Sequence, residues 1–372
     1  MTFNDQIRDV PHPGQFIREE LEERAWSQRD LAYILGTPEQ AVNMIIAGKR
    51  GVSPEMAKSL GKAFDVSADL FANLQSSYEM ARAREPDPSV ARRAKLQNVY
   101  PIREMIKRGW LEDTDAAMLE AQMARFFRVS AVGDIPQLEY AAKKTDYEDT
   151  PPSQLAWLFR VKQIAAEMVV TKYSEKLLKE ALLRLRSLLV DPEEVRHVPR
   201  ILAECGVRFV CVESLPNAKI DGVCFWLDKQ SPVIGLSVRF DRFDNFWFVL
   251  RHEIEHVLQK HDQQVAIVDA DVGVDSGDLP EEEVIANLAA AEFCVSPIEL
   301  ESFIARKGPF FAERDVVGFA RRISVHPAVV VGQIQRRTGR YDLLRKHLVK
   351  IRHHLLPSAV IDGWGVVAPI SM

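Results

Sequence analysis

The chain has 372 residues, of which 47% are hydrophobic and 27% are charged, and its formal net charge is −5. This composition is typical of a globular protein and excludes a fully disordered chain, a collagen-like fibre and a polycation. No apolar run approaches the roughly 20 residues of a membrane span. The first thirty residues are too charged for a signal peptide, and the four cysteines form no CxxC pair. We therefore expect a cytoplasmic protein of two or three domains.

The order of helical and β-rich patterns predicts a predominantly helical α+β protein. Pro86 and Pro88 cannot lie inside a helix, so they mark a boundary after an all-α first domain. Short β-rich runs between residues 205 and 240 predict a small antiparallel sheet. The predicted parts are a helix-turn-helix domain (1–84), a helical linker or middle region (85–154), a metal-binding domain (155–300) and a helical carboxy-terminal region with a basic segment (301–372).

Residues 27–46 have the pattern of two short helices joined by a tight turn. Ser27 is a good N-cap, and Asp30 is placed to complete a capping box. Gly36 ends the first helix at a position that favours left-handed backbone. Thr37 is predicted to cap the next helix, with Pro38 at its first position.

The second of these helices presents polar side chains outward near its start. Gln40 and Asn43 belong to the residue types that pair with adenine in the major groove. Lys49 and Arg50 follow the helix and can contact phosphate. The alternative is a helical docking module without a DNA role. The predicted DNA-contacting set is Gln28, Thr37, Glu39, Gln40, Asn43, Lys49 and Arg50.

The segments HPGQFIREELEERAWSQRDLAYILG and VNMIIAGKRGVSPEMAKSLGKAF resemble the XRE-type helix-turn-helix of HigA-family antitoxins. The resemblance covers roughly residues 10–80. It implies binding of double-stranded operator DNA by a homodimer and regulation of neighbouring genes.

Residues 252–256 contain the motif HExxH. On a helix, His252 and His256 lie one turn apart and can bind one Zn²⁺, with Glu253 as the base that takes a proton from water. Glu253 also falls at the centre of an apolar stripe, where an unused carboxylate is costly. The sequence therefore predicts a zinc site.

A catalytic zinc needs a third protein ligand, and three residues compete for this role. Asp262 has the spacing of the HExxHxxGxxH enzymes but lacks their glycine, and His261 points away on a continuous helix. Glu283 begins a predicted helix and shares a face with Ala286 and Ala290, which would allow close packing on the HExxH helix. We favour Glu283.

The segments KIDGVCFWLDKQSPVIGLSVRFDRFDNFWFVLRHEIEHVL and EEEVIANLAAAEFCVSP resemble the ImmA/IrrE family of zinc metallopeptidases. The resemblance covers roughly residues 155–300. It implies a zincin-like α+β domain with His252, His256 and Glu283 as zinc ligands and Glu253 as the catalytic base. It also implies cleavage of a transcriptional repressor. Because a helix-turn-helix module precedes this domain in the chain, the substrate would be a regulator protein, a toxin partner or the protein itself. Residues 220–240 could offer a strand edge to an extended peptide.

The main alternative is a non-catalytic DNA-binding repressor or antitoxin whose zinc domain only senses, stabilises or binds a partner. A third possibility is a metal-free scaffold for a peptide partner. The basic residues between 336 and 352 are interpreted as a solvated helix face rather than a nucleic-acid contact.

Overall fold

The computed structural model describes residues 10–130, 151–260, 267–270 and 280–370. The chain divides into two compact units, Met1–Pro88 and Ser89–Met372. The boundary lies at the predicted Pro86–Pro88 segment.

The first unit is a bundle of short helices, and its all-α character confirms the prediction. Its core is a single cluster that includes Ile17, Leu31, Ile45 and Phe64, each at most 3% exposed. Gly14 lies against the backbone of Ile45 so closely that a Cβ there would meet the carbonyl oxygen at 2.2 Å. The helices are α1 (Pro13–Glu23), α2 (Gln28–Leu35), α3 (Glu39–Ile46), α4 (Pro54–Phe64) and α5 (Ala68–Arg82).

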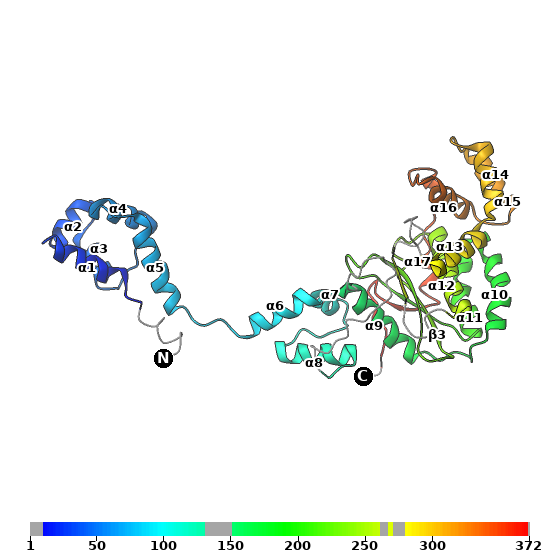
Figure 1. Ribbon diagram of the computed structural model, residues 1–372, viewed down its shortest axis with the longest axis horizontal. Coiled ribbons are helices and arrows are strands. Elements are labelled where there is room, and N and C mark those ends of the chain that lie inside the picture. The colour runs from blue at the N-terminus through cyan, green and yellow to red at the C-terminus, as the bar shows by residue number, and fades with distance from the viewer. Residues whose placement is uncertain (1–9, 131–150, 261–266, 271–279, 371–372) are drawn as a thin grey trace. The chain divides into compact units, whose positions relative to one another are not determined.

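The second unit is a five-stranded sheet between helical layers (Figure 1). Its strands are β1 (Arg208–Val212), β2 (Ile220–Trp226), β3 (Pro232–Leu236), β4 (Ile267–Ala270) and β5 (Val360–Asp362). Its helices before the sheet are α6 (Ser89–Val99), α7 (Ile102–Lys107), α8 (Ala116–Phe127), α9 (Pro152–Glu167), α10 (Glu175–Ser187) and α11 (Val198–Glu204). Those after β3 are α12 (Phe243–Gln259), α13 (Glu281–Cys294), α14 (Pro297–Lys307), α15 (Glu313–Arg322), α16 (Pro327–Thr338) and α17 (Arg352–Leu355).

The strand order is β4-β2-β3-β1-β5, and the sheet is mixed. β2 pairs antiparallel with β3 and β4, whereas β1 pairs in parallel with β3 and β5. The prediction of a predominantly helical α+β fold is confirmed. The predicted antiparallel hairpin is present as β2 and β3, but the pairs that β1 forms are parallel, so the sheet as a whole is mixed rather than antiparallel. The β2–β3 hairpin inserts β3 beside β1, which makes that pair parallel.

This strand order contradicts the prediction that residues 220–240 offer a free strand edge to a peptide. β2 and β3 each have a neighbour on both sides, so neither is an edge strand. The outer strands of the sheet are β4 and β5.

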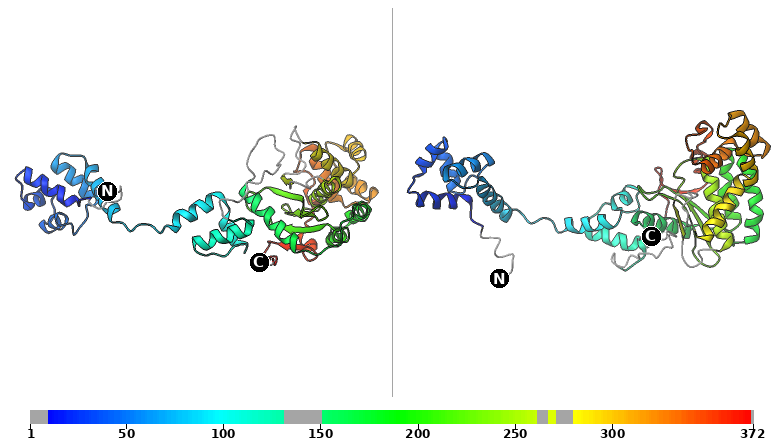
Figure 2. Two further views of the ribbon diagram at one scale, coloured as in Figure 1. Left: turned by 60° about the horizontal axis from the view of Figure 1, so that its bottom comes forward. Right: turned by 45° about the horizontal axis from the view of Figure 1, so that its top comes forward.

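The two faces of the sheet pack against different helices. Successive side chains of β1 point to opposite faces of the sheet and so belong to two different cores. Phe209 and Cys211 belong to the cluster around α12, whereas Val210 and Val212 belong to the cluster around α9. In both views of Figure 2, the cyan helices α6 to α8 and the yellow-to-orange helices α13 to α16 gather on different sides of the sheet. Trp157 of α9 and Trp247 of α12 are both fully buried.

The basic carboxy-terminal segment is not the helix that its charge pattern suggested. Arg345–His347 form a single 3₁₀ turn. Its neighbourhood contains surface ion pairs, including Lys346 with Glu313 and Arg337 with Glu301 at 2.8 Å. These exposed pairs agree with the interpretation of a solvated surface for Arg337 and Lys346. Arg336 does not fit it, because its side chain is only partly exposed and its guanidinium lies 3.4 Å from the centre of the Phe248 ring.

Candidate metal centre and nucleic-acid interface

Helix α12 carries the HExxH residues into the interior of the second unit. Its apolar residues Phe246, Val249 and Val257 are at most 4% exposed, and they pack against β2, β3 and the neighbouring helices. The helix ends at Lys260, whose φ of 55° is left-handed. This packing leaves His252, Glu253 and His256 with no exposed surface.

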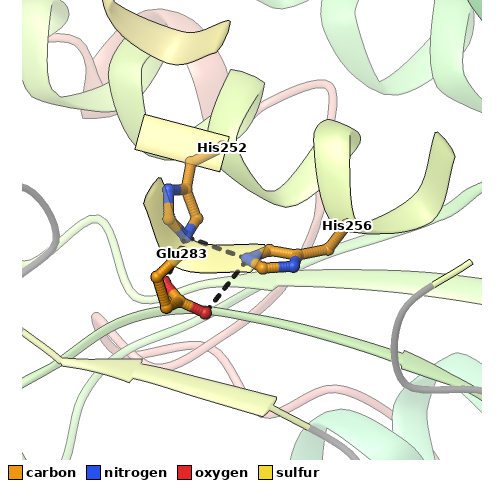
Figure 3. A group of neighbouring side chains, drawn as sticks. All are labelled: His252, His256 and Glu283. Carbon is orange, nitrogen blue, oxygen red and sulfur yellow. Dashed lines mark hydrogen bonds and ion pairs between the residues drawn. The ribbon is translucent and has the colours of Figure 1, made fainter. Parts of the chain in front are cut away.

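His252, His256 and Glu283 form the predicted cluster (Figure 3). The Nε2 atoms of the two histidines are 3.1 Å apart. Glu283 places Oε2 3.2 Å from His252 Nε2 and Oε1 3.5 Å from His256 Nε2. Donors bound at about 2.0–2.1 Å around a tetrahedral zinc would be about 3.3–3.4 Å apart. Glu283 approaches the two histidines with different oxygens, and one donor atom from each of the three residues lies within 4.8 Å of the others. The three side chains therefore form a candidate site for one metal ion.

Glu283 reaches this cluster because α13 packs closely on α12. Ala286 and Ala290 are fully buried on the same face of α13, and their small side chains allow the close approach. Glu283 lies in the first turn of α13 and is 8% exposed. Of the three candidates for the third ligand, the structure brings Glu283 to the histidines, while His261 and Asp262 lie outside the described residues.

Glu253 lies on the side of α12 that faces β2. A Cβ at Gly222 would lie 2.1 Å from Glu253 Oε1, so any larger residue there would push this carboxylate from its present position. Gly222 is not among the residues predicted for the site. A glycine in the middle of a buried β-run was the available signal.

Glu255, on the same helix, is only 7% exposed. Arg251 and Gln259 donate to its two carboxylate oxygens, each at 2.7 Å. Burial raises the pKa of Glu255, but these hydrogen bonds and the Arg251 charge outweigh it and hold the pKa below its ordinary value. This ion pair fixes the same helix turns that carry the histidines.

The turn between α2 and α3 confirms most of the predicted local signals. Ser27 accepts from the Asp30 N–H, and Asp30 accepts from the Ser27 N–H in a complete capping box. Gly36 ends α2 with a φ of 62°. Val42 and Ile45 are buried on the inner side of α3.

The predicted DNA-contacting residues on α3 lie on its exposed side. Glu39, Gln40 and Asn43 are all exposed, as are Lys49 and Arg50 just beyond the helix and Gln28 at the start of α2. Glu39 also forms an exposed ion pair with Arg29 of α2 at 3.3 Å.

The prediction that Thr37 caps α3 is wrong. The helix begins at Glu39, its N-cap position is Pro38, and no side chain forms the cap hydrogen bond. Pro38 has extended backbone, with ψ of 138°, and this moves the helix start one residue along the chain. Thr37 is only half-buried and stays beside the turn.

Comparison with known proteins identifies the first unit. A helix-turn-helix family model matches residues 17–71. The uncharacterised HTH-type transcriptional regulator YddM of Escherichia coli (strain K12) is 32% identical over 93 residues, which cover 25% of this chain and 99% of that protein. The chain belongs to the helix-turn-helix family.

Two further proteins resemble part of this helix-turn-helix chain. Virulence-associated protein A' of Dichelobacter nodosus is 33% identical over 81 residues, which cover 22% of the chain and 70% of that protein. The second is the Pseudomonas aeruginosa antitoxin HigA, whose structure was solved with the higBA promoter and whose sequence is 37% identical. The match covers 24% of this chain and 92% of the HigA chain, with a TM-score of 0.20.

One residue that supports the helix-turn-helix unit was missed in the sequence. Gln75 of α5 is 8% exposed, and its Oε1 accepts from the Val52 N–H at 2.9 Å. This bond holds the loop that follows α3 and carries Lys49 and Arg50. A glutamine inside a helix gives no local sign of such a contact.

Among the helices that the structure describes, none combines the length and apolarity needed to span a membrane.

Proposed function

We propose that the protein is a DNA-binding transcriptional regulator of the antitoxin-like type whose second unit is a zinc-dependent endopeptidase. The observation that carries the peptidase proposal is the convergence of His252, His256 and Glu283 on one buried point, with Glu253 beside it on the same helix. Three protein ligands with a fourth position for water is the arrangement of catalytic rather than structural zinc sites. The proposed substrate is a regulator protein, a toxin partner or the chain itself.

The residues present would each have a distinct task. The two imidazole nitrogens and the Glu283 carboxylate would hold the ion, which when bound supplies Lewis acidity for activation of water and the peptide carbonyl. Glu253 would accept the proton of the attacking water and return it to the leaving amine nitrogen. Glu253 has no exposed surface, and its carboxylate lies beside Gly222.

Metal content tests this proposal. We expect about one zinc per chain in the purified protein by elemental analysis, because three buried side chains of the types that bind zinc converge there. His252→Ala should lose it, since two ligands remain. His197→Ala is the matched control, because His197 is exposed and lies outside the cluster. No metal in the unaltered protein after zinc is supplied would contradict the proposal and leave the second unit as a scaffold.

For the first unit, we propose that α3 lies in the major groove of operator DNA and that a homodimer places two such helices on two half-sites. The exposed amides of Gln40 and Asn43 support this proposal, because both can bond adenine edges through two hydrogen bonds. Lys49 and Arg50 would contact the phosphates beside them.

Asn43→Ala should weaken binding to the operator by about 1–3 kcal/mol, or roughly 5- to 150-fold, because one base contact is lost. Fluorescence anisotropy with DNA from upstream of the gene, at a fixed salt concentration, measures this change. Asn73→Ala on the exposed surface of α5 is the matched control. Equal affinities of the two variants would place the DNA interface elsewhere.

A further inference from the structure

A carboxylate lies at the start of the helix that we propose for the major groove. Glu39 is the first residue of α3, and its side chain is 44% exposed. Gln40 and Asn43 follow on the exposed side of the same helix. Double-stranded DNA carries one negative charge for about every 1.7 Å of its axis. A carboxylate that faces DNA from this position is therefore repelled unless it has a specific partner there.

Arg29 of α2 forms an ion pair with this carboxylate. Its Nε atom donates to Glu39 Oε2 at 3.3 Å, and its side chain is 84% exposed. The helix dipole already favours an acid at this end of α3, and an exposed ion pair adds little to stability. The pair is therefore better explained by what the carboxylate contacts than by a role in holding the unit together.

The two helices under this pair are fixed relative to each other. Four of their residues lie in one core and are at most 5% exposed, namely Leu31, Ala32, Val42 and Ile45. The Thr37 N–H donates to the Ala32 carbonyl at 3.0 Å and closes the turn between the helices. This packing keeps the backbones of Arg29 and Glu39 in register, while both side chains extend into solvent.

Arg29 uses only one oxygen of the Glu39 carboxylate. None of the described residues donates a hydrogen bond to the other oxygen, Oε1. An ionised carboxylate only accepts hydrogen bonds, so this oxygen needs a donor. In the major groove, cytosine presents the N4 amino donor, guanine presents two acceptors, and adenine presents its N6 donor beside the N7 acceptor. Cytosine is therefore the base whose edge matches a carboxylate.

We propose that Glu39 reads a cytosine in the operator and that Arg29 is its positioning residue. Glu39 Oε1 accepts a hydrogen bond from cytosine N4, while Arg29 holds Oε2 and offsets the negative charge beside the phosphates. This inference rests on the proposed placement of α3 in the major groove. It adds the class of base that the start of the helix reads, which is one C·G pair in each half-site.

Selection of bound duplexes from a randomised DNA library, with the full chain at a fixed salt concentration and followed by sequencing, tests this proposal. The unaltered protein should enrich one cytosine per half-site. Glu39→Gln should change that preference to adenine by about 5- to 150-fold at this position alone, because glutamine bonds both N6 and N7 of adenine.

The role of Arg29 is tested by the same selection. Arg29→Ala should reduce the preference for cytosine at the Glu39 position and leave the other positions of the site unchanged. Arg29→Lys should retain most of this preference, because a cation remains beside the carboxylate. A purely structural role would lower binding to all sequences alike and would not change the preference at one position.

Glu22→Gln is the matched control, because it removes the same charge from the exposed surface of α1 and should leave every base preference unchanged. An unchanged preference in Glu39→Gln would overturn the proposal. Tighter binding of Glu39→Gln to all sequences alike would also overturn it, since Glu39 would then act only through its charge. If Asn43→Ala changes one position of the site and Glu39→Gln changes none, only this inference fails. If neither variant changes any position, the placement of α3 in the major groove fails as well.

Discussion

Asp362→Ala is expected to lower the free energy of unfolding of the second unit by about 3–5 kcal/mol, because it leaves a buried guanidinium without its partner. Asp362 has no exposed surface, and Arg160 is 2% exposed. Arg160 donates to Asp362 Oδ2 through Nε at 3.0 Å and Nη2 at 2.5 Å, while Trp110 Nε1 donates to Oδ1 at 2.6 Å. The Ala368 N–H donates to Oδ2 at 3.0 Å.

This carboxylate therefore joins four parts of the second unit. Trp110 follows α7, Arg160 belongs to α9, Asp362 ends β5 and Ala368 lies in the segment beyond it. Removing one acceptor breaks all these contacts at once, and the buried donors cannot reach water. Such a loss is comparable with the whole stability of many domains.

Urea unfolding of the full chain, followed by circular dichroism, measures this effect. The transition of the second unit should move to a lower urea concentration. Asp342→Ala serves as the matched control, since Asp342 pairs with Arg340 on the exposed surface and should leave the transition unchanged. Coincident transitions for Asp362→Ala and the unaltered protein would show that the buried pair adds nothing to stability.

Glu253→Gln is expected to reduce peptide hydrolysis by about 10²- to 10⁴-fold, the range that a general base contributes. The change keeps the shape of the side chain and removes its ability to accept a proton. Because Glu253 is not one of the three clustered donors, zinc content should stay at the level of the unaltered protein. An inactive variant that retains its zinc would show that Glu253 acts as the base and not as a metal ligand.

The measurement is mass spectrometry of the fragments that form when the zinc-loaded chain is incubated alone and with regulator proteins encoded beside it. Glu292→Gln, on the exposed side of α13, is the isosteric control and should give the fragments of the unaltered protein. The same fragments from Glu253→Gln at the same rate would exclude it as the base. Metal without fragments in any of the three proteins would favour a sensing or stabilising role for zinc.

The features that the sequence predicted well depend on residues close together in the chain. The Ser27–Asp30 capping box, Gly36 and the one-turn spacing of the two histidines all follow from local geometry. Glu283 lies 27 positions beyond His256, yet its helix was recognisable from its acidic start and the small residues Ala286 and Ala290 on one face.

The features that the sequence did not predict depend on distant partners. The pair of Arg160 and Asp362 spans 202 positions, and neither residue has a neighbour in sequence that indicates it. The parallel pairing of β1 with β5 depends on a strand of only three residues. Burial of Glu255 depends on the packing of α12 in the interior and not on its place in the helical repeat.

β5 lies near the end of the second unit, so its position determines when the sheet can be completed during synthesis. Val210 of β1 pairs with Val360 of β5, so the sheet stays incomplete until nearly all of the second unit has left the ribosome. At about 5 to 20 residues per second, synthesis of that unit takes roughly 15 to 60 seconds. The helix-turn-helix unit contains its whole core before Pro88 and can fold during this interval. In each new chain, the helix-turn-helix unit can therefore fold before the sheet is complete. That sheet packs against α12, the helix that carries His252 and His256.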